Sequence, residues 1–568
     1  MSDVDPTITA SASDVPRPTN TLVTPLLTDL YQITMAYAHW KTGRHDDPAV
    51  FELFFRKNPF GGEYTIFAGL DECLKHLAHF KFTDSDVDYL KTVPALQYCD
   101  PAFFEWLLQL DTSQVKVRSM RDGEVAFPRV PLIVVEAPLA IGQLIETTLL
   151  TLVNYPSLIA TNAARMVRAA RDKGPIPDGL PPQCSRTPAC IEFGLRRAQG
   201  PDGGFSASKY SAVGGFDGTS NVQAGKLLGL KLSGTHAHAF VMAYSSLDQI
   251  KDLAVQDKST GENVELLPKV LEYREQLNED NPAYGTTNDG ELAAFIAYAA
   301  AFPRSFLCLI DTYDTLRSGL LNFILVALVL DDCGYNSFGV RLDSGDLAYL
   351  SMECARAFAV IALSRQRPSF YALDVVASND INEAVLKALN EQKHAITVYG
   401  IGTNLVTCQA QPALGCVYKL VEISGLPRLK LSQEIAKVLI PGKKKPFRLF
   451  GKDGRPLLDV LVGKDEDDPV AGERILCRHP FVARKRANVT PSRVEALHTL
   501  VFEDGKVVPG ANRSLDQAKK AVEEQLETFR PDILRYINPT PYKVSVSPNL
   551  FTFLHELWQS ETPVPELS

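Results

Sequence analysis

The chain has 568 residues, of which 45% are hydrophobic and 22% are charged, a composition typical of a soluble globular protein. It excludes a wholly disordered chain, a collagen-like repeat and a coiled coil. Lys and Arg number 58 against 67 Asp and Glu, which gives a formal net charge of −9. Because a duplex-binding protein needs a basic face, we expect no nucleic-acid partner. At about 100–200 residues per domain, the length predicts roughly three domains, or two large ones.

The chain carries no recognisable targeting or membrane-spanning segment. Residues 1–21 lack the basic and apolar regions of a signal peptide and the Arg-rich character of a transit peptide, so we predict a disordered lead-in. Most of the ten cysteines stand alone in apolar contexts, such as Cys308 and Cys408, which predicts buried reduced thiols and a cytosolic protein. The longest apolar run, residues 320–330, contains Asn322 and is too short to span a bilayer. We therefore expect a buried helix there and no membrane partner.

Residues 22–140 are predicted to form an N-terminal α/β domain. The run LLTDLYQITMAYAHWKTG has its apolar residues at helical spacing, and Gly43 suits the end of that helix. The runs AVFELFFRKNPF and EVAFPRVPLIVVEAPLA are rich in β-branched and aromatic residues, which predicts strands.

Residues 141–420 alternate between strand-like and helical runs. The strand-like runs, each ending in polar or glycine residues, are IEFGLRRA, KLSGTHAH, RSFLCLIDT, FGVRLDSGD, YALDVVASND and HAITVYGIGT. Helical runs such as GLLNFILVALVLDDCG and DINEAVLKALNEQ lie between them. This alternation predicts an α/β fold with parallel strands joined by helices, and ligands bind such folds at the strand ends.

Two further regions complete the organisation. The proline-rich stretch within residues 172–189 contains PIPDGLPP, which disfavours a helix and predicts a surface insertion. Residues 421–568 form a C-terminal region with a lysine-rich start, KKKPFRLFGKDGRPLLDVL, and a helical run, SLDQAKKAVEEQLETF.

The run HAITVYGIGTNLVT indicates a phosphate site. Gly400 and Gly402 let backbone N–H groups approach an anion, and Thr403 adds a hydroxyl donor. The alternative is a tight turn between strand and helix, which has about equal weight on these residues alone.

The run FGVRLDSGDL places Arg341 inside a strand with two carboxylates beyond it. Arg341 offers a planar fork for a carboxylate or phosphate. Asp343 and Asp346 could hold ribose hydroxyls or Mg²⁺. The alternative is that Asp343 or Ser344 only caps the next helix, which leaves Arg341 unexplained.

The run KLSGTHAHAF places His236 and His238 on the same side of an expected strand, after Thr235. A zinc site would need a third ligand, which is not evident nearby, so metal binding is the weaker interpretation. A histidine at a strand end can act as a general base or as a nucleophile toward phosphate. By itself the motif fits a structural histidine better.

Two other motifs add candidate binding residues. The run EFGLRRAQGPDGG supplies Arg196 and Arg197 before a glycine-rich loop. Tyr31, at a predicted helix start, could stack on a flat ring, although a lone tyrosine is more often a packing aromatic.

In this order, the motifs closely resemble the nicotinate phosphoribosyltransferase family. The resemblance covers about residues 26–564 and departs at the lead-in and at the insertion around residues 172–189. It is carried by LLTDLYQITM, FELFFRKNPF, EFGLRRAQGPDGG, GGFDGTSNV, GTHAH, DTYDT, VRLDSGDL, ASNDI, GIGTNLVT and NPTPYKVSVS.

The resemblance implies an enzyme that condenses nicotinate with 5-phosphoribosyl 1-diphosphate. The products are nicotinate mononucleotide and diphosphate, in NAD salvage. ATP is implied as a co-substrate, hydrolysed through transient phosphorylation of the histidine matched by His238. The fold implied is a partly irregular α/β barrel of the TIM-barrel-like type II class, with an N-terminal α/β domain and a C-terminal segment packed on both. A homodimer whose sites are completed across the interface is also implied.

The resemblance also assigns site residues. Tyr31, Thr235 and Arg341 match positions that bind nicotinate, and Thr403 matches one that binds phosphoribosyl diphosphate. We add the remaining candidates for the phosphoribosyl diphosphate from their chemistry: Gly400, Gly402, Asp343 and Arg196. Mg²⁺ or Mn²⁺ is expected with the diphosphate, and Asp343 and Asp346 are the candidate ligands.

Three alternatives remain open on the sequence. A nicotinamide phosphoribosyltransferase would share most of these motifs and differ in the cation offered to a carboxylate. A non-catalytic homologue could bind nucleotides as a sensor. A sugar-phosphate barrel enzyme such as an aldolase would need a Schiff-base lysine.

Overall fold

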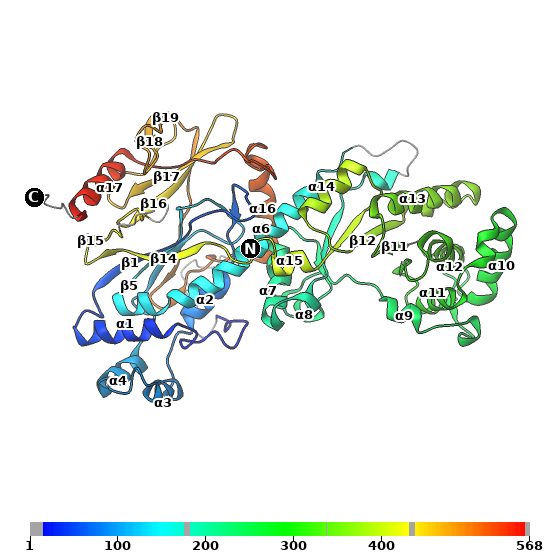
Figure 1. The fold of residues 1–568 in the computed structure, drawn as a ribbon, viewed down its shortest axis with the longest axis horizontal. Helices are drawn as coiled ribbons and strands as arrows, with labels where there is room; N and C mark the ends of the chain where they lie inside the picture. Colours follow the sequence, from blue (N-terminus) through cyan, green and yellow to red (C-terminus); the bar gives the residue numbers. More distant parts are fainter. Residues whose placement is uncertain (1–14, 175–181, 337, 431–437, 563–568) are drawn as a thin grey trace, which may run out of the picture. The chain divides into compact units, whose positions relative to one another are not determined.

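The computed structural model describes residues 15–174, 182–336, 338–430 and 438–562 (Figure 1). The chain divides into two compact units. The first unit comprises residues 1–162, 213–215 and 409–568, and the second comprises residues 163–212 and 216–408. The division falls within helix α6 (Glu146–Arg171). The N-terminal and C-terminal parts of the chain therefore share one unit, and the middle of the chain forms the other.

The first unit contains an antiparallel sheet that joins distant parts of the sequence. Its order is β15-β14-β1-β5-β3-β21-β22. The strand bounds are β1 (Pro48–Phe55), β3 (Lys116–Ser119), β5 (Pro131–Pro138), β14 (Cys416–Ile423), β15 (Leu426–Pro427), β21 (Thr499–Glu503) and β22 (Lys506–Val507). Every residue of β1 after Pro48 is buried, because both faces of this central strand are covered.

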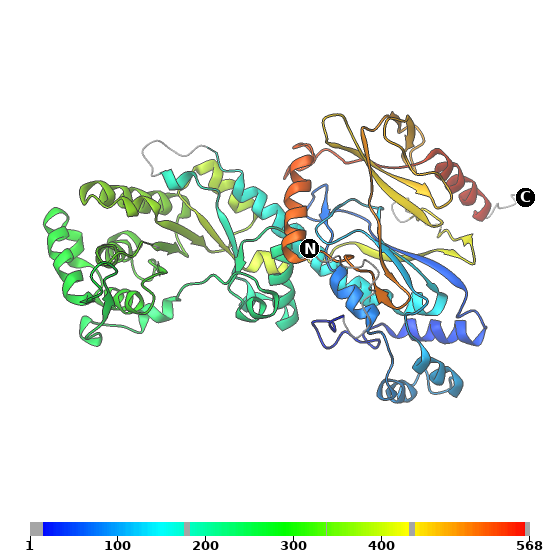
Figure 2. The same ribbon diagram turned by 180° about the vertical axis from the view of Figure 1, so that it is seen from behind.

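A second sheet of the first unit comes from the C-terminal region alone, in the order β19-β18-β23-β17-β16-β20. Its strands are β16 (Lys444–Phe450), β17 (Pro456–Gly463), β18 (Ile475–Arg478), β19 (Arg486–Val489), β20 (Arg493–Ala496) and β23 (Val544–Val546). Figure 2 shows these yellow-to-orange strands beside the blue N-terminal elements of the same unit. Arg448 and Asp459 face each other on β16 and β17, both fully buried, in a two-pronged ion pair at 2.8 and 3.0 Å.

The remaining elements of the first unit are mainly helices around these sheets. They are α1 (Leu30–Lys41), α2 (Leu70–Ala78), α3 (Asp84–Thr92), α4 (Pro101–Gln109), α5 (Leu139–Leu144), α16 (Leu515–Thr528) and α17 (Pro548–Glu561), with the short strands β2 (Thr65–Ile66) and β4 (Val125–Ala126). The predicted helix before Gly43 is confirmed as α1, and Gly43 has the positive φ of 70° that favours glycine after a helix.

The second unit is built on a parallel sheet of six strands, ordered β10-β11-β12-β13-β6-β7 and curled into half a barrel. The strands are β6 (Ala189–Glu192), β7 (Gly218–Thr219), β10 (Phe306–Leu309), β11 (Phe338–Leu342), β12 (Asp374–Ser378) and β13 (Val398–Ile401). Between β10 and β13 each strand is followed by a helix, as the alternating sequence pattern predicted. The α/β barrel class is confirmed in this half-barrel form.

Helices and one hairpin surround this sheet. They are α7 (Gly200–Val213), α8 (Val222–Leu228), α9 (His238–Met242), α10 (Leu266–Asp280), α11 (Asp289–Ala301), α12 (Leu320–Asp332), α13 (Leu347–Ser364), α14 (Glu383–Gln392), α15 (Thr403–Thr407) and the hairpin β8 (Ala254–Gln256)–β9 (Asn263–Glu265). The apolar run 320–330 is confirmed as a fully buried helix. By length and composition, α13 would also reach across a bilayer, but it buries Leu347, Ala355 and Phe358 inside this unit.

One predicted strand is wrong. The run KLSGTHAH makes a single bridge, between Thr219 and Leu232, and α9 begins at His238. The neighbouring strand β7 is only two residues long, so it offers few backbone partners for a longer ladder. His236 and His238 therefore do not share the face of a strand.

Two other predictions fall partly outside the described residues. Residues 1–14 of the lead-in and 175–181 of the insertion are not described. Within the described part, the Thr19 backbone N–H and hydroxyl both donate to the Glu72 carboxylate, and Pro182–Ser185 form a 3₁₀ turn.

Candidate functional site

The carboxyl ends of the parallel strands in the second unit bring most of the predicted site residues together. Two cavities, of about 620 and 120 Å³, lie at these ends. Phe193, Arg196, Arg341 and Asp343 line both cavities. The larger cavity adds Leu195, Thr235, His238 and Leu309, and the smaller adds Arg197, Ser378, Gly400, Gly402 and Thr403. One compartment is therefore partly apolar, and its neighbour is lined by arginines, hydroxyls and a glycine-rich turn.

Arg341 is held in a fixed orientation at the end of β11. Its Nε donates to Ser378 Oγ at 2.9 Å, Nη1 to Thr235 Oγ1 at 3.4 Å, and Nη2 to Asp343 Oδ1 at 3.3 Å. The side chain is 16% exposed, so the guanidinium still faces the cavities. Ser378 also donates to the same Asp343 oxygen, which closes the network. A guanidinium fixed in this way is ready to bind a planar anion.

His238 lies beside two carboxylates. Its Nε2 is 3.8 Å from Asp311 Oδ1 and 3.9 Å from Asp343 Oδ2, and its Nδ1 is bonded to Thr312 Oγ1 at 3.1 Å. The imidazole is 39% exposed, whereas the Asp311 side chain is only 2% exposed. Thr312 therefore orients the ring with Nε2 toward the acidic side of the cavity.

Asp311 is a site residue that the sequence reasoning did not assign, although it opens the motif DTYDT. Its Oδ2 accepts from the Asp343 backbone N–H at 3.1 Å and from the Ser344 hydroxyl. Its Oδ1 is buried and has no hydrogen-bond partner among the described residues. A carboxylate directly after the buried strand β10 was the available signal. Asp311 fixes the loop that carries Asp343 and presents one oxygen toward His238.

His236 has a different environment from His238. It packs against Tyr298, Phe240 and Phe295, and its Nε2 accepts from the Leu309 backbone N–H at 3.3 Å. Burial lowers the pKa of His236 to about 4, so the ring is neutral at physiological pH. His236 lines the larger cavity as His238 does, but its packing and its backbone hydrogen bond indicate a structural role.

The Phe193 ring depends on the glycine-rich turn. A Cβ on Gly400 would lie 2.5 Å from the Phe193 ring, so only glycine lets the ring occupy this position. Arg341 Cζ lies 5.2 Å from the centre of the same ring. Phe193 therefore forms a flat apolar wall beside the guanidinium, a role that the sequence reasoning did not assign.

Glu192, the residue before Phe193, holds this strand end in place through its hydrogen bonds. Its fully buried carboxylate accepts from the Gly194 backbone N–H, from Ser208 Oγ at 2.9 Å and from Thr219 Oγ1 at 2.6 Å. Ser208 lies on α7 and Thr219 on β7, so both elements are tied to the strand end. The run GPDGG, which the sequence predicted as a loop, forms the start of α7. An acidic residue at the end of an apolar strand was the only signal in the sequence.

The second predicted carboxylate does not join the cavities. Asp346 accepts from the Tyr349 backbone N–H at 3.0 Å and caps α13. The sequence had suggested this capping role for Asp343 or Ser344. It does not line either cavity, whereas Asp343 lines both. Among the described residues, no group of three or more His, Cys, Asp or Glu side chains could hold a metal ion.

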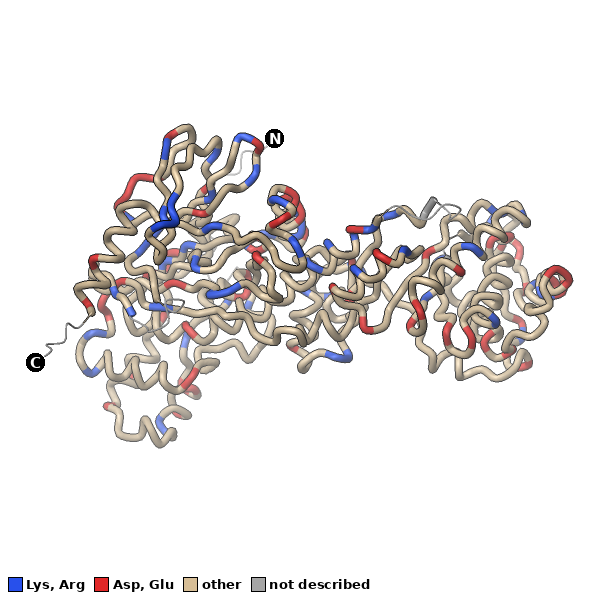
Figure 3. Tube along the Cα trace, turned by 45° about the horizontal axis from the view of Figure 1, so that its top comes forward, with Lys and Arg blue, Asp and Glu red and all other residues tan. Residues whose placement is uncertain are grey.

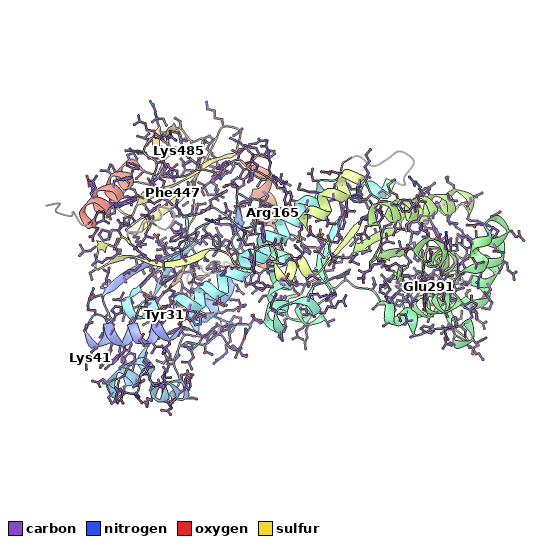
Figure 4. The ribbon with its side chains drawn as sticks, in the orientation of Figure 1. Tyr31, Lys41, Arg165, Glu291, Phe447 and Lys485 are labelled. Carbon is purple, nitrogen blue, oxygen red and sulfur yellow. The ribbon has the colours of Figure 1, made fainter. Side chains whose placement is uncertain are left out.

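Tyr31 belongs to the first unit. It lies on α1 with 49% of its surface exposed (Figure 4). Its predicted stacking role remains a prediction.

Comparisons with known proteins agree with the motifs. Residues 26–154 match the nicotinate phosphoribosyltransferase N-terminal domain, residues 189–447 the nicotinate phosphoribosyltransferase family, and residues 443–554 the C-terminal domain. The chain is 51% identical over 557 residues to nicotinate phosphoribosyltransferase 1 of Arabidopsis thaliana, covering 97% of this chain and 96% of that one. It is 43% identical to the nicotinate phosphoribosyltransferase of Homo sapiens, covering 95% and 97%. The crystal structure of human nicotinic acid phosphoribosyltransferase superposes with a TM-score of 0.82 at 41% identity, covering 93% of this chain and 99% of that one.

Proposed function

The chain belongs to the nicotinate phosphoribosyltransferase family, and we propose that it joins nicotinate to 5-phosphoribosyl 1-diphosphate with the help of ATP, in NAD salvage. The observation that carries this proposal is the Arg341 guanidinium, held by Ser378, Thr235 and Asp343 between the two cavities. A fixed cation at the boundary of an apolar compartment suits a flat ring that bears a carboxylate.

The larger cavity supports nicotinate binding. The pyridine ring would lie against Phe193, Leu195 and Leu309, and its carboxylate would accept hydrogen bonds from Arg341. Thr235, which shares the Arg341 network, is placed to help orient that carboxylate. The amide of nicotinamide is neutral, so it would lose the charge-assisted part of this interaction. This difference favours nicotinate over the nicotinamide alternative.

The smaller cavity supports binding of the phosphoribosyl diphosphate. Gly400 on β13, Gly402 after it and Thr403 at the start of α15 line this cavity, so the backbone N–H groups beyond the strand and the Thr403 hydroxyl would bind a phosphate. Arg196 adds a cation. Asp343 lines both cavities and is placed to accept hydrogen bonds from ribose hydroxyls. The sugar carbon C1 would then lie near the boundary that the two cavities share.

The transfer itself needs positioning more than a nucleophilic side chain. The C1–O bond to diphosphate breaks with its electron pair leaving on diphosphate, and the pyridine nitrogen lone pair forms the new C1–N bond. Positive charge develops on C1 during this exchange, and the carboxylate of Asp343 is placed to stabilise it. The protein residues therefore orient the two substrates and favour the charge distribution of the transition state.

A divalent cation fits this site as a partner of the diphosphate. Mg²⁺ commonly binds through one or two carboxylates, substrate phosphates and water, and Asp343 is the carboxylate that faces both cavities. When bound, Mg²⁺ or Mn²⁺ would neutralise charge on the departing diphosphate.

His238 is proposed to carry a transient phosphoryl group on Nε2. The terminal phosphoryl of ATP would move to Nε2, the P–O bond to ADP breaking as the P–N bond forms and the ring losing its proton. Hydrolysis then releases inorganic phosphate. Because Nε2 lies 3.8–3.9 Å from Asp311 and Asp343, phosphorylation would place new negative charge beside the carboxylate that contacts Arg341. Such a change can shift the site between states of different substrate affinity.

Replacement of His238 by Asn tests this role. We expect the variant to lose ATP stimulation and the acid-labile phosphate but to keep slow ATP-independent formation of nicotinate mononucleotide. The control is His236→Asn, because the His236 ring packs against Tyr298 and its Nε2 already accepts from the Leu309 backbone N–H, so it should not be phosphorylated. Labelled phosphate retained in the His238 variant would contradict the proposal.

The overall activity is tested by a product assay with nicotinate and nicotinamide side by side, with and without ATP. We expect nicotinate mononucleotide as the main product and a higher rate with ATP. No product under any condition would favour the sensor alternative, and equal use of nicotinamide would favour the nicotinamide enzyme. Light scattering of the purified protein should give about twice the chain mass if, as we propose, the enzyme is a cytosolic homodimer.

A further inference from the structure

A second cavity with basic walls lies in the first unit, outside the set of residues assigned to the reaction. Its volume is about 300 Å³, at the lower end of the range for small-ligand pockets. Five cationic side chains line it, against the single carboxylate of Asp468. They are Arg118 on β3, Lys443, Lys444 and Lys445 around the start of β16, and Lys464 after β17. These include the lysine-rich run that the family motifs left without a role.

Not every group in this cavity contributes free positive charge. Lys444 is buried with Glu52, at 2.6 Å, and this pair is internally neutralised. Burial lowers the pKa of His498 to about 4, with nearby Arg118 and Lys444 adding to the effect, so His498 is neutral at pH 7. Its Nε2–H donates to the Pro131 carbonyl oxygen, 2.7 Å away. The other three lysines also have carboxylate partners, so the charge that no carboxylate neutralises resides on Arg118, and the lysines add hydrogen-bond donors.

The three lysines keep hydrogen-bonding capacity. Lys443 pairs with Glu136 at 2.8 Å, Lys464 with Glu422 at 2.7 Å, and Lys445 with Asp468 at 2.5 Å. Each ammonium has three donors. Lys445 also donates to the Glu466 carbonyl oxygen at 2.7 Å, so it keeps one donor for a ligand, whereas the carboxylates leave Lys443 and Lys464 more. The Asp468 side chain is 61% exposed, and such a pair is weak enough to yield to a ligand.

Arg118 is the cation without a carboxylate partner. It is exposed on β3 and forms no ion pair with any residue in the described ranges. Val134, Pro446, Phe447 and Ala496 supply apolar wall next to these cations. The combination of an unpaired guanidinium, three accessible ammonium groups and a restricted volume selects a compact anion of high charge. (Lys and Arg positions are blue in Figure 3.)

We propose that this cavity binds a small phosphate anion, with diphosphate as the best fit in size and charge. Several separated cations match the oxygens at both ends of diphosphate better than those of a single phosphate. This proposal does not depend on the proposed function, because it uses none of the residues assigned to the reaction. It predicts a phosphate-type site in the first unit, separate from the site that we propose for the reaction in the second unit.

Calorimetric titration of the full chain with inorganic diphosphate tests the proposal. To separate the two sites, the titration is done in an Arg196→Ala, Thr403→Val background, which removes the cation and the hydroxyl that we assign to the phosphoribosyl diphosphate. We expect one remaining binding event, weakened about tenfold or more by the added double substitution Arg118→Ala and Lys464→Gln. Arg118→Glu alone is the second variant, because it keeps Lys464 paired with the partly buried Glu422. Arg455→Ala, an exposed arginine in the turn before β17, is the matched control and should leave the affinity unchanged.

Parallel titrations with inorganic phosphate and with ATP identify the source of the anion. Tightest binding of diphosphate supports the proposal as stated, whereas tighter binding of either alternative would overturn the choice of diphosphate. If Arg118→Glu and the double variant bind all three anions as tightly as the background does, the cavity is not an anion site. Product formation by the Arg118→Glu variant without the Arg196 and Thr403 substitutions should match that of the unaltered chain, and its loss would contradict independence from the reaction.

Discussion

Replacement of Arg341 by Ala should raise the KM for nicotinate strongly. Arg341 Nε, Nη1 and Nη2 are held by Ser378, Thr235 and Asp343, and the side chain is only 16% exposed. The lost interaction is a shielded charge-assisted hydrogen bond, which is worth about 1.5–3 kcal/mol. We therefore expect the nicotinate KM to rise about 10- to 150-fold.

The assay is steady-state formation of nicotinate mononucleotide at saturating phosphoribosyl diphosphate and ATP. Arg341→Lys is the matched control, because it keeps the charge but loses the planar fork, and its KM should lie between those of the other two proteins. The discrimination between nicotinate and nicotinamide should fall in parallel with the rise in KM, since nicotinamide carries no carboxylate. Thermal unfolding should be similar for all three proteins, which separates a binding defect from misfolding.

An unchanged nicotinate KM in the Ala variant would refute the assignment of Arg341 to the carboxylate. A fall in kcat alone, at constant KM, would also refute it and would place Arg341 in transition-state stabilisation.

Three further predictions concern the pH dependence, the site wall and the core. Burial raises the pKa of Glu291 (Figure 4) from 4.5 to about 7. The folded state therefore binds this proton more tightly than the unfolded state does. The free energy of unfolding should fall by up to about 3 kcal/mol as the pH rises from 4.5 to 7. Urea unfolding of Glu291→Gln should lack this loss, and an identical pH profile would contradict the reasoning. Gly400→Ala should displace the Phe193 ring and lower kcat/KM for nicotinate by at least about tenfold. Gly174→Ala is the control, because a Cβ there would meet open space and should leave kcat/KM unchanged. Equal kcat/KM values for the two variants would show that Phe193 does not belong to the site. Asp459→Ala should destabilise the first unit by about 3–5 kcal/mol because it leaves Arg448 buried and unpaired, whereas loss of the exposed Asp88–Lys91 pair in Asp88→Ala should cost less than about 1 kcal/mol in the same denaturation experiment.

Local sequence pattern predicted most of the second unit. Strands β10 to β13 are short apolar runs ended by polar or glycine residues, and α12 is a continuous apolar run, so burial alone specifies them. The run with His236 and His238 was misjudged, because its strand character depended on a neighbour, β7, that is only two residues long. Pairing of a strand depends on its partner, which a single run does not contain.

The residues of the candidate site also divide into those that the sequence predicted and those that it did not. The residue types of Arg341 and of the run from Gly400 to Thr403 already suggested anion binding, whereas Thr235 and His238 were assigned through the resemblance to the family. Asp311 and Glu192 were missed, since an isolated carboxylate after a strand has no specific meaning in one dimension.

The sequence by itself determined the family, the alternation of strands and helices and the residue types of the site. Only the tertiary structure decided that Asp343 faces both cavities while Asp346 caps α13, and that Asp311 lies beside His238. It alone brought Arg118 and Lys464, far apart in the chain, to one cavity. The physical reason is that motifs record chemistry and periodicity, whereas the order and register of strands fix which distant side chains meet.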